Sequence, residues 1–235
     1  MVEEGRDERR ERLSAELPEW YRPVLASRDA EVAFRLGSYH LLHRGWSHAG
    51  FARAWFAVAA ELGGVGMAWR ISVEHIDWGD DHLAAWWMHY AIAHEYREHP
   101  SGITVDPHVF ALIFDDLGAA VGQDFGVTVV AADAGRLEAA LDTAARRYEL
   151  ITADGRELDD HATLDRLLDD GGDLDPRNYT PNAVMTTSTT IFCDCKDGTM
   201  PLMARTMIRV LVEELATAGL QGAEVRPRPT SDFDR

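Results

Sequence analysis

Cysteine is scarce in this chain, which has only Cys193 and Cys195, separated by one residue. A secreted disulfide scaffold needs more cysteines at wider spacings, so we expect reduced thiols that pack as small apolar groups in a strand. No apolar run reaches the ~18–20 residues that a transmembrane helix needs. The first residues also lack the basic patch and apolar stretch of a secretory signal. We therefore expect a cytoplasmic protein with no membrane partner.

Basic residues are also few. The 235 residues include 23 Lys and Arg against 40 Asp and Glu, which gives a net charge of −17. A field of that sign repels nucleic-acid phosphates and anionic lipids, so no nucleic acid is expected as a partner. Two interpretations of the charge remain. It keeps the protein soluble, or it forms an acidic surface that docks a basic protein.

Complete catalytic signatures are absent as well. The chain has no P-loop, no Gly-x-Gly-x-x-Gly and no Gly-x-Ser-x-Gly. What it has instead is an N-terminal half rich in histidine and tryptophan. Nine of the ten histidines lie between residues 40 and 108, and all seven tryptophans precede residue 90. So many aromatic rings predict either a large aromatic core or a binding surface.

The N-terminal half is predicted to be mainly helical. The pattern predicts a helical hairpin over 28–44 and 47–62, with Gly63 and Gly64 ending the second helix. From Met67 to Ile76, apolar and polar residues alternate, which predicts a strand. Helices are expected again over 79–98, where Asp80 or Asp81 can cap the start, and from Asp106 onward.

The C-terminal half mixes strands and helices. Strands are predicted over 126–130, 149–152, 183–195 and 222–226, with helices over 133–148 and 201–218. This β-α-β, β-α-β order predicts a ferredoxin-like sandwich with two helices on one face of a four-stranded antiparallel sheet. The expected class is α+β. The expected divisions are a flexible charged N-terminus (1–19), a helix-rich half (20–123), a ferredoxin-like half (124–230) and a tail (231–235).

Several histidines have spacings that suit metal ligands on helices. His40 and His43 are three residues apart, and His82 and His89 are seven apart, so each pair shares a helix face. His94 and His99 are five apart, which turns their rings about 140° away from each other on a helix. The candidate ligands are His40, His43, His89 and His94, but they complete no known signature. No metal is predicted, and the cofactor stays open.

A possible acid–base cluster lies where the predicted strand meets the next helix. It contains His75, Asp77 and His82, and a His–Asp pair there could transfer protons. No nucleophile stands beside it in the sequence. Trp86 and His89 would line a binding site next to the cluster, between the two halves.

A run of hydroxyl residues occupies the predicted strand 183–195. Alternation would put Thr186, Ser188 and Thr190 on one face, either through β-propensity alone or as a polar floor for a ligand. Lys196 follows in the loop before the last predicted helix, whose N-terminus could bind an anion.

Two function hypotheses follow from these patterns. The first is an acidic interaction protein, immunity- or antitoxin-like or regulatory, that binds a basic partner; the net charge and the missing catalytic signatures favour it. The alternative is a small-molecule enzyme or binding protein, metal-dependent or not, with a His, Asp and aromatic site between the halves. The sequence fixes neither the reaction nor the oligomeric state.

Overall fold

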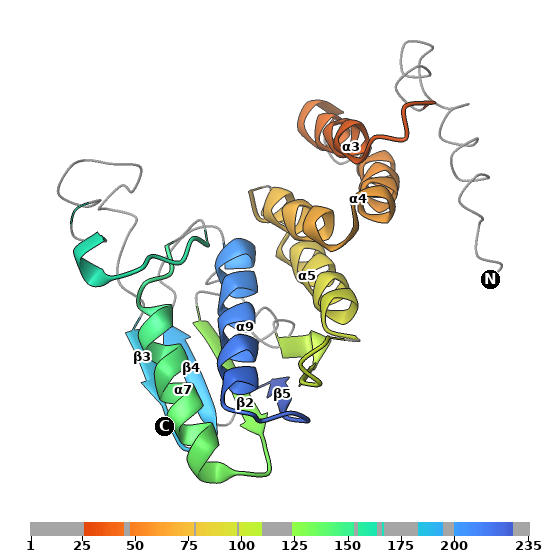
Figure 1. Ribbon diagram of the computed structural model, residues 1–235. Helices are drawn as coiled ribbons and strands as arrows, with labels where there is room; N and C mark the ends of the chain where they lie inside the picture. The colour runs from red at the N-terminus through yellow and green to blue at the C-terminus, as the bar shows by residue number, and fades with distance from the viewer. Residues whose placement is uncertain are drawn as a thin grey trace.

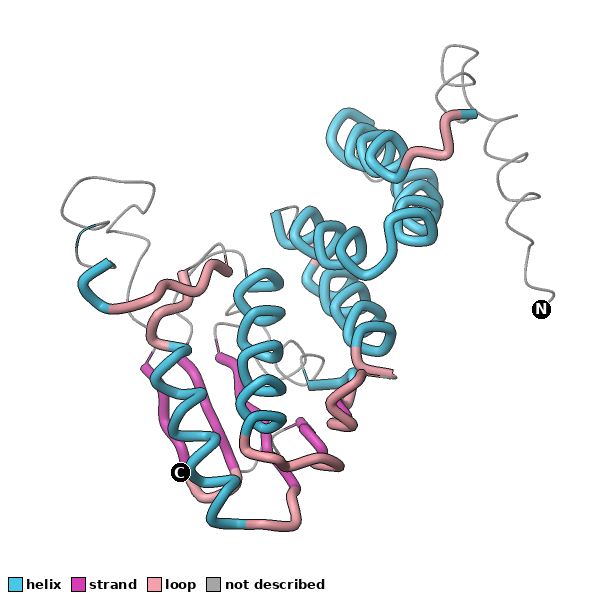
Figure 2. Tube along the Cα trace, viewed as in Figure 1, coloured by secondary structure: helices cyan, strands magenta, loops and turns pink. Residues whose placement is uncertain are grey.

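The structure is a computed structural model that describes residues 26–44, 48–77, 79–97, 99–109, 124–152, 155–163, 166, 183–194 and 200–227. It confirms the α+β class. A group of helices from the N-terminal half lies beside a sheet that carries two further helices (Figures 1 and 2). The elements are α3 (Ala30–Arg44), α4 (Ala49–Asp77), α5 (Asp81–Glu95), β1 (Thr104–Val105), η3 (Pro107–Val109), β2 (Asp124–Val130), α7 (Ala134–Tyr148), β3 (Ala183–Thr186), β4 (Thr190–Asp194), α9 (Met200–Thr217) and β5 (Glu224–Pro227).

Helices α3 and α4 form the predicted hairpin. Phe34 of α3 packs on Phe56 of α4 with ring centroids 5.7 Å apart, and both side chains are buried. Gly37 lets the helices come this close, because a Cβ at this position would lie 2.5 Å from the Phe56 ring. The hairpin is therefore held by an aromatic contact that requires a residue without a side chain opposite it.

The strand predicted from Met67 to Ile76 is wrong, because this segment is the second part of α4. Gly64 interrupts the helix with φ 66° and ψ −155°, a conformation that is essentially restricted to glycine. After the kink the chain is helical again. The buried positions follow the helical period, with Ala68, Ile71, Ser72 and His75 on one side. The glycines thus end one helix, as expected, and another helix follows.

Helix α4 is also the one helix, among the described residues, that is long and apolar enough to cross a membrane by length and composition. Buried core helices of soluble proteins pass the same test. Here α4 bends at Gly64 and packs against α3, α5 and α9.

The sheet has the order β1-β5-β2-β4-β3. Neighbours are antiparallel from β5 through β3, and the two-residue β1 pairs in parallel with β5 at the edge. Helices α7 and α9 cover one face (Figure 1). The predicted apolar positions of α7 are all buried, namely Leu137, Ala140, Leu141, Ala144 and Tyr148. The predicted cap is confirmed too, since Asp133 accepts a hydrogen bond from the Arg136 amide.

Two strand predictions in this half need correction. The single strand predicted over 183–195 is a hairpin, β3 and β4, with the turn at Thr187–Thr189. The Thr187 hydroxyl accepts from the amides of Thr189 and Thr190, at 3.3 and 3.0 Å, and these local bonds stabilise the turn. The strand predicted over 149–152 is not in the sheet. Ile151 forms only an isolated bridge with Glu157.

The helix predicted from Asp106 is described only as far as η3, and its remainder lies outside the described residues. The cap predicted for the helix after Gly79 is confirmed. Asp80 caps α5 by accepting a hydrogen bond from the Leu83 amide, at 3.2 Å. Helix α5 packs against both α4 and η3.

Candidate functional site: the aromatic and histidine face of helix α5

Helix α5 carries a ladder of stacked rings on its outward side. Trp86, Tyr90 and His94 follow one another at intervals of four residues, so they share one helix face. The Trp86 and Tyr90 rings stack with centroids 5.9 Å apart, and the Tyr90 and His94 rings are 4.1 Å apart. Trp86 is 54% exposed although it is among the largest apolar side chains of the protein. We call these three residues the α5 ladder.

The ladder is anchored in the protein through Trp87. Neighbouring helix residues point about 100° apart, and here Trp87 is buried while Trp86 is exposed. The two indoles meet edge to face with centroids 4.8 Å apart. His94 is fixed as well, because its Nδ1 lies 2.8 Å from the Tyr90 carbonyl oxygen. These contacts hold the α5 ladder in position.

A second set of polar groups lies one turn along the same helix. The ring of His89, three residues after Trp86, meets the His108 ring of η3 with centroids 4.4 Å apart. Asp106 accepts from the His108 amide at 2.8 Å and lies 3.0 Å from its Nδ1. Partial burial, and then the neighbouring His108, hold the pKa of His89 below its usual value. Asp106 thus orients His108 by hydrogen bonding, and His108 packs against His89, an arrangement that acid–base chemistry could use.

The predicted acid–base cluster is not one open site. His75 is 1% exposed and lies in the core, where burial lowers its pKa to about 4. His82 is exposed at the start of α5. The side chain of Asp77 lies outside the described residues. His75 and His82 thus face different environments, and the nearby Asp80 is used as a helix cap.

The hydroxyl residues do not form one polar floor, because the turn separates them. Thr186 donates to Asp142 of α7 at 3.1 Å, Ser188 lies exposed in the turn, and Thr190 pairs with Thr128 of β2. Lys196 and Cys195 lie outside the described residues, as does the side chain of Cys193.

The structure brings His40 close to a histidine that the spacing analysis did not pair with it. The Nδ1 atoms of His40 and His48 are 3.3 Å apart. They are eight positions apart, and because α3 ends between them the spacing does not place them on one helix face. The His43 side chain lies outside the description, and His94 belongs to the α5 ladder. No three His, Cys, Asp or Glu side chains among the described residues gather as a metal site.

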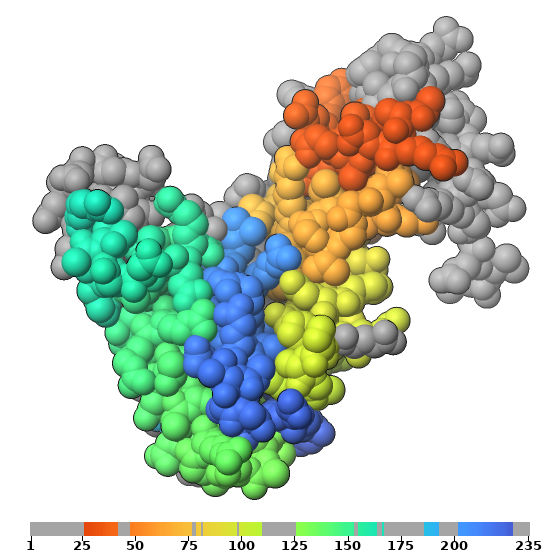
Figure 3. All heavy atoms as spheres, viewed as in Figure 1, coloured from red at the N-terminus to blue at the C-terminus, as the bar shows by residue number. Residues whose placement is uncertain are grey.

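Besides the pairing of β1 with β5, the two halves meet at a polar contact that does not involve the predicted histidines. Glu95 of α5 accepts from the Trp69 indole of α4 at 3.0 Å and from Arg205 of α9 at 3.1 Å. Figure 3 shows α9 and α5 in contact along this junction. Whether the halves form two domains, divided after residue 123, stays a prediction.

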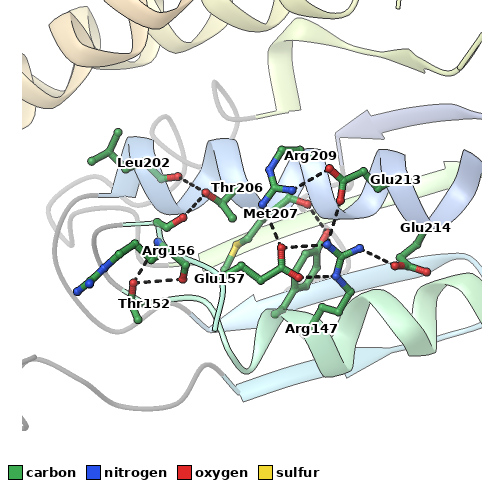
Figure 4. A network of polar contacts seen from close by, with 12 residues as sticks. Arg147, Thr152, Arg156, Glu157, Leu202, Thr206, Met207, Arg209, Glu213 and Glu214 are labelled. Atoms are coloured by element: carbon green, nitrogen blue, oxygen red, sulfur yellow. Dashed lines mark hydrogen bonds and ion pairs between the residues drawn. The ribbon is translucent and has the colours of Figure 1, made fainter. Parts of the chain in front are cut away.

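A denser network joins α7 and α9 (Figure 4). Arg147 donates to Glu157, Glu213 and Glu214, with the nearest contacts at 2.5 to 2.9 Å. These hydrogen bonds raise the pKa of Arg147 and lower that of Glu157. The Thr206 hydroxyl donates to the Gly155 carbonyl oxygen at 2.6 Å, so the segment after α7 is held on α9. The Arg147 cation is neutralised by carboxylates of the same chain. We therefore interpret the network as a structural clamp that holds α7 to α9.

Comparison of the chain with protein-family models, with curated protein sequences and with solved structures gives no match. The α5 ladder is a stack of three rings of which Trp86 and His94 are exposed to solvent. The sequence analysis indicated Trp86 and His89 as binding residues and did not include Tyr90 or His94 in the binding site. The four-residue spacing of Trp86, Tyr90 and His94 is the pattern that could have predicted the α5 ladder.

Proposed function

We propose that this chain is an acidic, cytoplasmic protein-binding module that contacts its partner through the α5 ladder. The exposure of Trp86 carries the proposal. Among the described residues, Trp86 and Val130 are the exposed large apolar side chains, and Trp86 alone belongs to an aromatic stack. Tryptophan and tyrosine are enriched among the residues that dominate binding energy at protein interfaces. Exposing an indole to water without a partner forfeits the free energy of burying it.

The chemistry of the chain favours a basic partner. The net charge of −17 attracts lysine- and arginine-rich surfaces, and indole rings bind such cations over their faces. The chain makes the same kind of contact internally. The Arg70 guanidinium lies 4.1 Å from the centroid of Phe34 while it pairs with Glu31. An arginine of the partner over Trp86 would repeat this arrangement. An immunity- or antitoxin-like role is one form such binding could take.

We also infer a ferredoxin-like arrangement for the C-terminal half. The element order β2-α7-β3-β4-α9-β5 and the antiparallel order β5-β2-β4-β3 support it, with β1 as an addition at the edge. That arrangement occurs with many unrelated activities, so it does not decide the function.

The alternative is a small-molecule enzyme, and one observation favours it. Asp106 orients His108, and His108 contacts His89, whose pKa is lowered, beside an exposed aromatic surface. An oriented imidazole of this kind can act as a general base. If His108→Gln lost a catalytic activity but still bound the partner, the enzyme would be favoured. If Trp86→Ala lost partner binding, the binding module would be favoured.

The test of the proposed function uses three purified forms as baits, namely the wild type, Trp86→Ala and Val130→Ala. Proteins that bind at low salt are identified, and their affinities are then measured as purified pairs. We expect a basic partner whose affinity falls at least about tenfold for Trp86→Ala and steeply with salt. Val130→Ala, the matched loss of an exposed apolar group, should bind like the wild type. Equal affinity of the wild type and Trp86→Ala would refute the α5 ladder as the contact surface.

A further inference from the structure

His40 and His48 lie together at the corner between α3 and α4. His40 belongs to the last turns of α3 and is 5% exposed, while the partly buried His48 directly precedes α4. Their Nδ1 atoms are 3.3 Å apart. We propose that these two imidazoles are ligands of a binding site for a divalent transition-metal ion such as Zn²⁺.

The distance between the two nitrogens supports this proposal. Zn²⁺ binds imidazole nitrogen at about 2.0–2.1 Å in tetrahedral geometry, which separates two nitrogens on the same ion by roughly 3.3 Å. The His40–His48 separation has this value. The rings are nearly parallel, with an interplanar angle of 14° and centroids 5.5 Å apart, so both side chains would rotate to point their nitrogens at one ion.

The rings are also held in position by their neighbours. His40 stacks on Phe51 with centroids 5.5 Å apart and meets Tyr39 edge-on at 5.8 Å. His48 packs on the same Phe51 at 5.4 Å. Without an ion, one ring can donate an N–H···N hydrogen bond to the other, which keeps the two Nδ1 atoms at ligand spacing. Metal binding would replace that single proton by the ion.

The ligand type indicates which ions would bind. Neutral imidazole suits zinc, copper and nickel, whereas magnesium and calcium prefer oxygen ligands. Among the described residues no third ligand joins the pair. Two histidines should give a weaker site than the three or four protein ligands of most zinc centres. The ion would bridge α3 to α4, and its open positions could accept a further ligand.

This proposal is independent of the α5 ladder, and its test uses Zn²⁺ alone as the probe. The protein, freed of any metal-binding tag and stripped with chelator, competes with a chromophoric chelator for Zn²⁺. Wild type, His48→Gln and His82→Gln are compared. His82→Gln is the matched control, because it removes an exposed histidine from another helix. Circular dichroism checks that each variant is folded.

We expect one Zn²⁺ per wild-type chain, bound more weakly than by the three or four protein ligands of most zinc centres. His48→Gln should weaken it at least tenfold, and His82→Gln should leave it unchanged. Co²⁺ bound to the wild type should show the visible absorption of a four-coordinate ion, lost in His48→Gln. Zn²⁺ should also raise the melting temperature of the wild type but not of His48→Gln, since an ion that binds only the folded state stabilises it. Equal Zn²⁺ binding by wild type and His48→Gln, or no binding by either, would overturn the metal site and leave a hydrogen-bonded pair.

Discussion

The imidazole of His75 meets the ring of Phe56 edge-on, with centroids 5.3 Å apart and an interplanar angle of 69°. This contact lies inside the helical half, where Phe56 is fully buried and His75 is 1% exposed. Neither ring nitrogen of His75 has a hydrogen-bond partner within the described structure. A buried polar group in that position costs free energy, and its charged form costs more.

Protonation of His75 should therefore destabilise the protein. Burial lowers its pKa in the folded state from 6.5 to about 4; the nearby Asp80 opposes this shift and Arg53 adds to it. Because the unfolded chain binds the proton more tightly, stability is complete above pH 6.5 and is lost as the pH falls toward 4. The loss attributable to His75 should reach about 3 kcal/mol. Denaturant titrations between pH 7.5 and 4 measure it.

Other groups titrate in the same range, so a variant isolates the effect of His75. His75→Leu removes the proton-binding group and the unsatisfied nitrogens while retaining an apolar side chain. The stability difference between variant and wild type should shift in favour of the variant as the pH falls. A difference that stays constant from pH 7.5 to 4 would show that His75 does not titrate in this way.

The segment that carries His75 also shows where sequence reasoning fails. Met67, Trp69, Ile71 and Val73 alternate with polar residues, so a strand was predicted there. The same segment satisfies the helical period through Ala68, Ile71, Ser72 and His75, and packing against α3 and α5 selects the helix. Over ten residues both periods fit, and only tertiary contacts distinguish them. Because alanine and serine occupy two of the buried positions, the sequence showed little of the apolar stripe that marks a buried helix face.

The single strand predicted over 183–195, which contains the threonine run, was wrong for a different reason. Its β-propensity was real, but the Thr187 hydroxyl also bonds to the backbone of the next residues and reverses the chain. Helix α7 was predicted almost completely, because its five buried residues and its Asp133 cap are all local signals. Tyr90 and His94 could have been recognised from their spacing. The pairing of His40 with His48 could not, because it depends on the angle between two helices.

Replacing Gly37 by alanine should destabilise the α3–α4 hairpin. The added Cβ would lie 2.5 Å from the buried Phe56 ring, which has little room to move. Overpacking of this kind costs about 1–3 kcal/mol, more than the gain in helix propensity. Gly50→Ala is the matched control, since a Cβ there meets nothing within 4 Å. Urea unfolding should show a loss for Gly37→Ala and no loss, or a small gain, for Gly50→Ala; similar results for the two would contradict the close packing.

Replacing Arg147 by alanine should weaken the clamp between α7 and α9. Three carboxylates, Glu157, Glu213 and Glu214, would then lose a shared cation. Because the network is partly open to solvent, we expect a loss of about 1–2 kcal/mol that shrinks at high salt. The neighbouring Arg146 donates to Thr143 and serves as the control. Unfolding in urea at low and high salt should separate Arg147→Ala from Arg146→Ala, and equal stabilities would argue against a clamp.

The same network should contribute to acid sensitivity at lower pH. Hydrogen bonds from Arg147 hold the pKa of Glu157 below its ordinary value of 4.5. Its contribution is therefore present above pH 4.5 and is lost as the pH falls through the lowered pKa. Glu157→Gln should flatten the stability profile below pH 4.5 and leave the range between 4.5 and 6.5 unchanged. A change confined to the higher range would contradict this assignment.

Glu95 should decide how firmly the two halves are joined. Its carboxylate accepts from the buried Trp69 indole and from Arg205 of α9, so one side chain links α4, α5 and α9. Glu95→Ala removes the acceptor from both donors, and we expect a loss of about 1–3 kcal/mol. Hydrogen exchange should accelerate in α9 near Arg205 and in the second part of α4, while α7 keeps its protection. Glu138→Ala, an exposed position on α7, provides the control. If Glu95→Ala exchanged like Glu138→Ala, the β1–β5 pairing and the apolar contacts would be enough to hold the halves together, and the Glu95 contacts would be incidental to the fold.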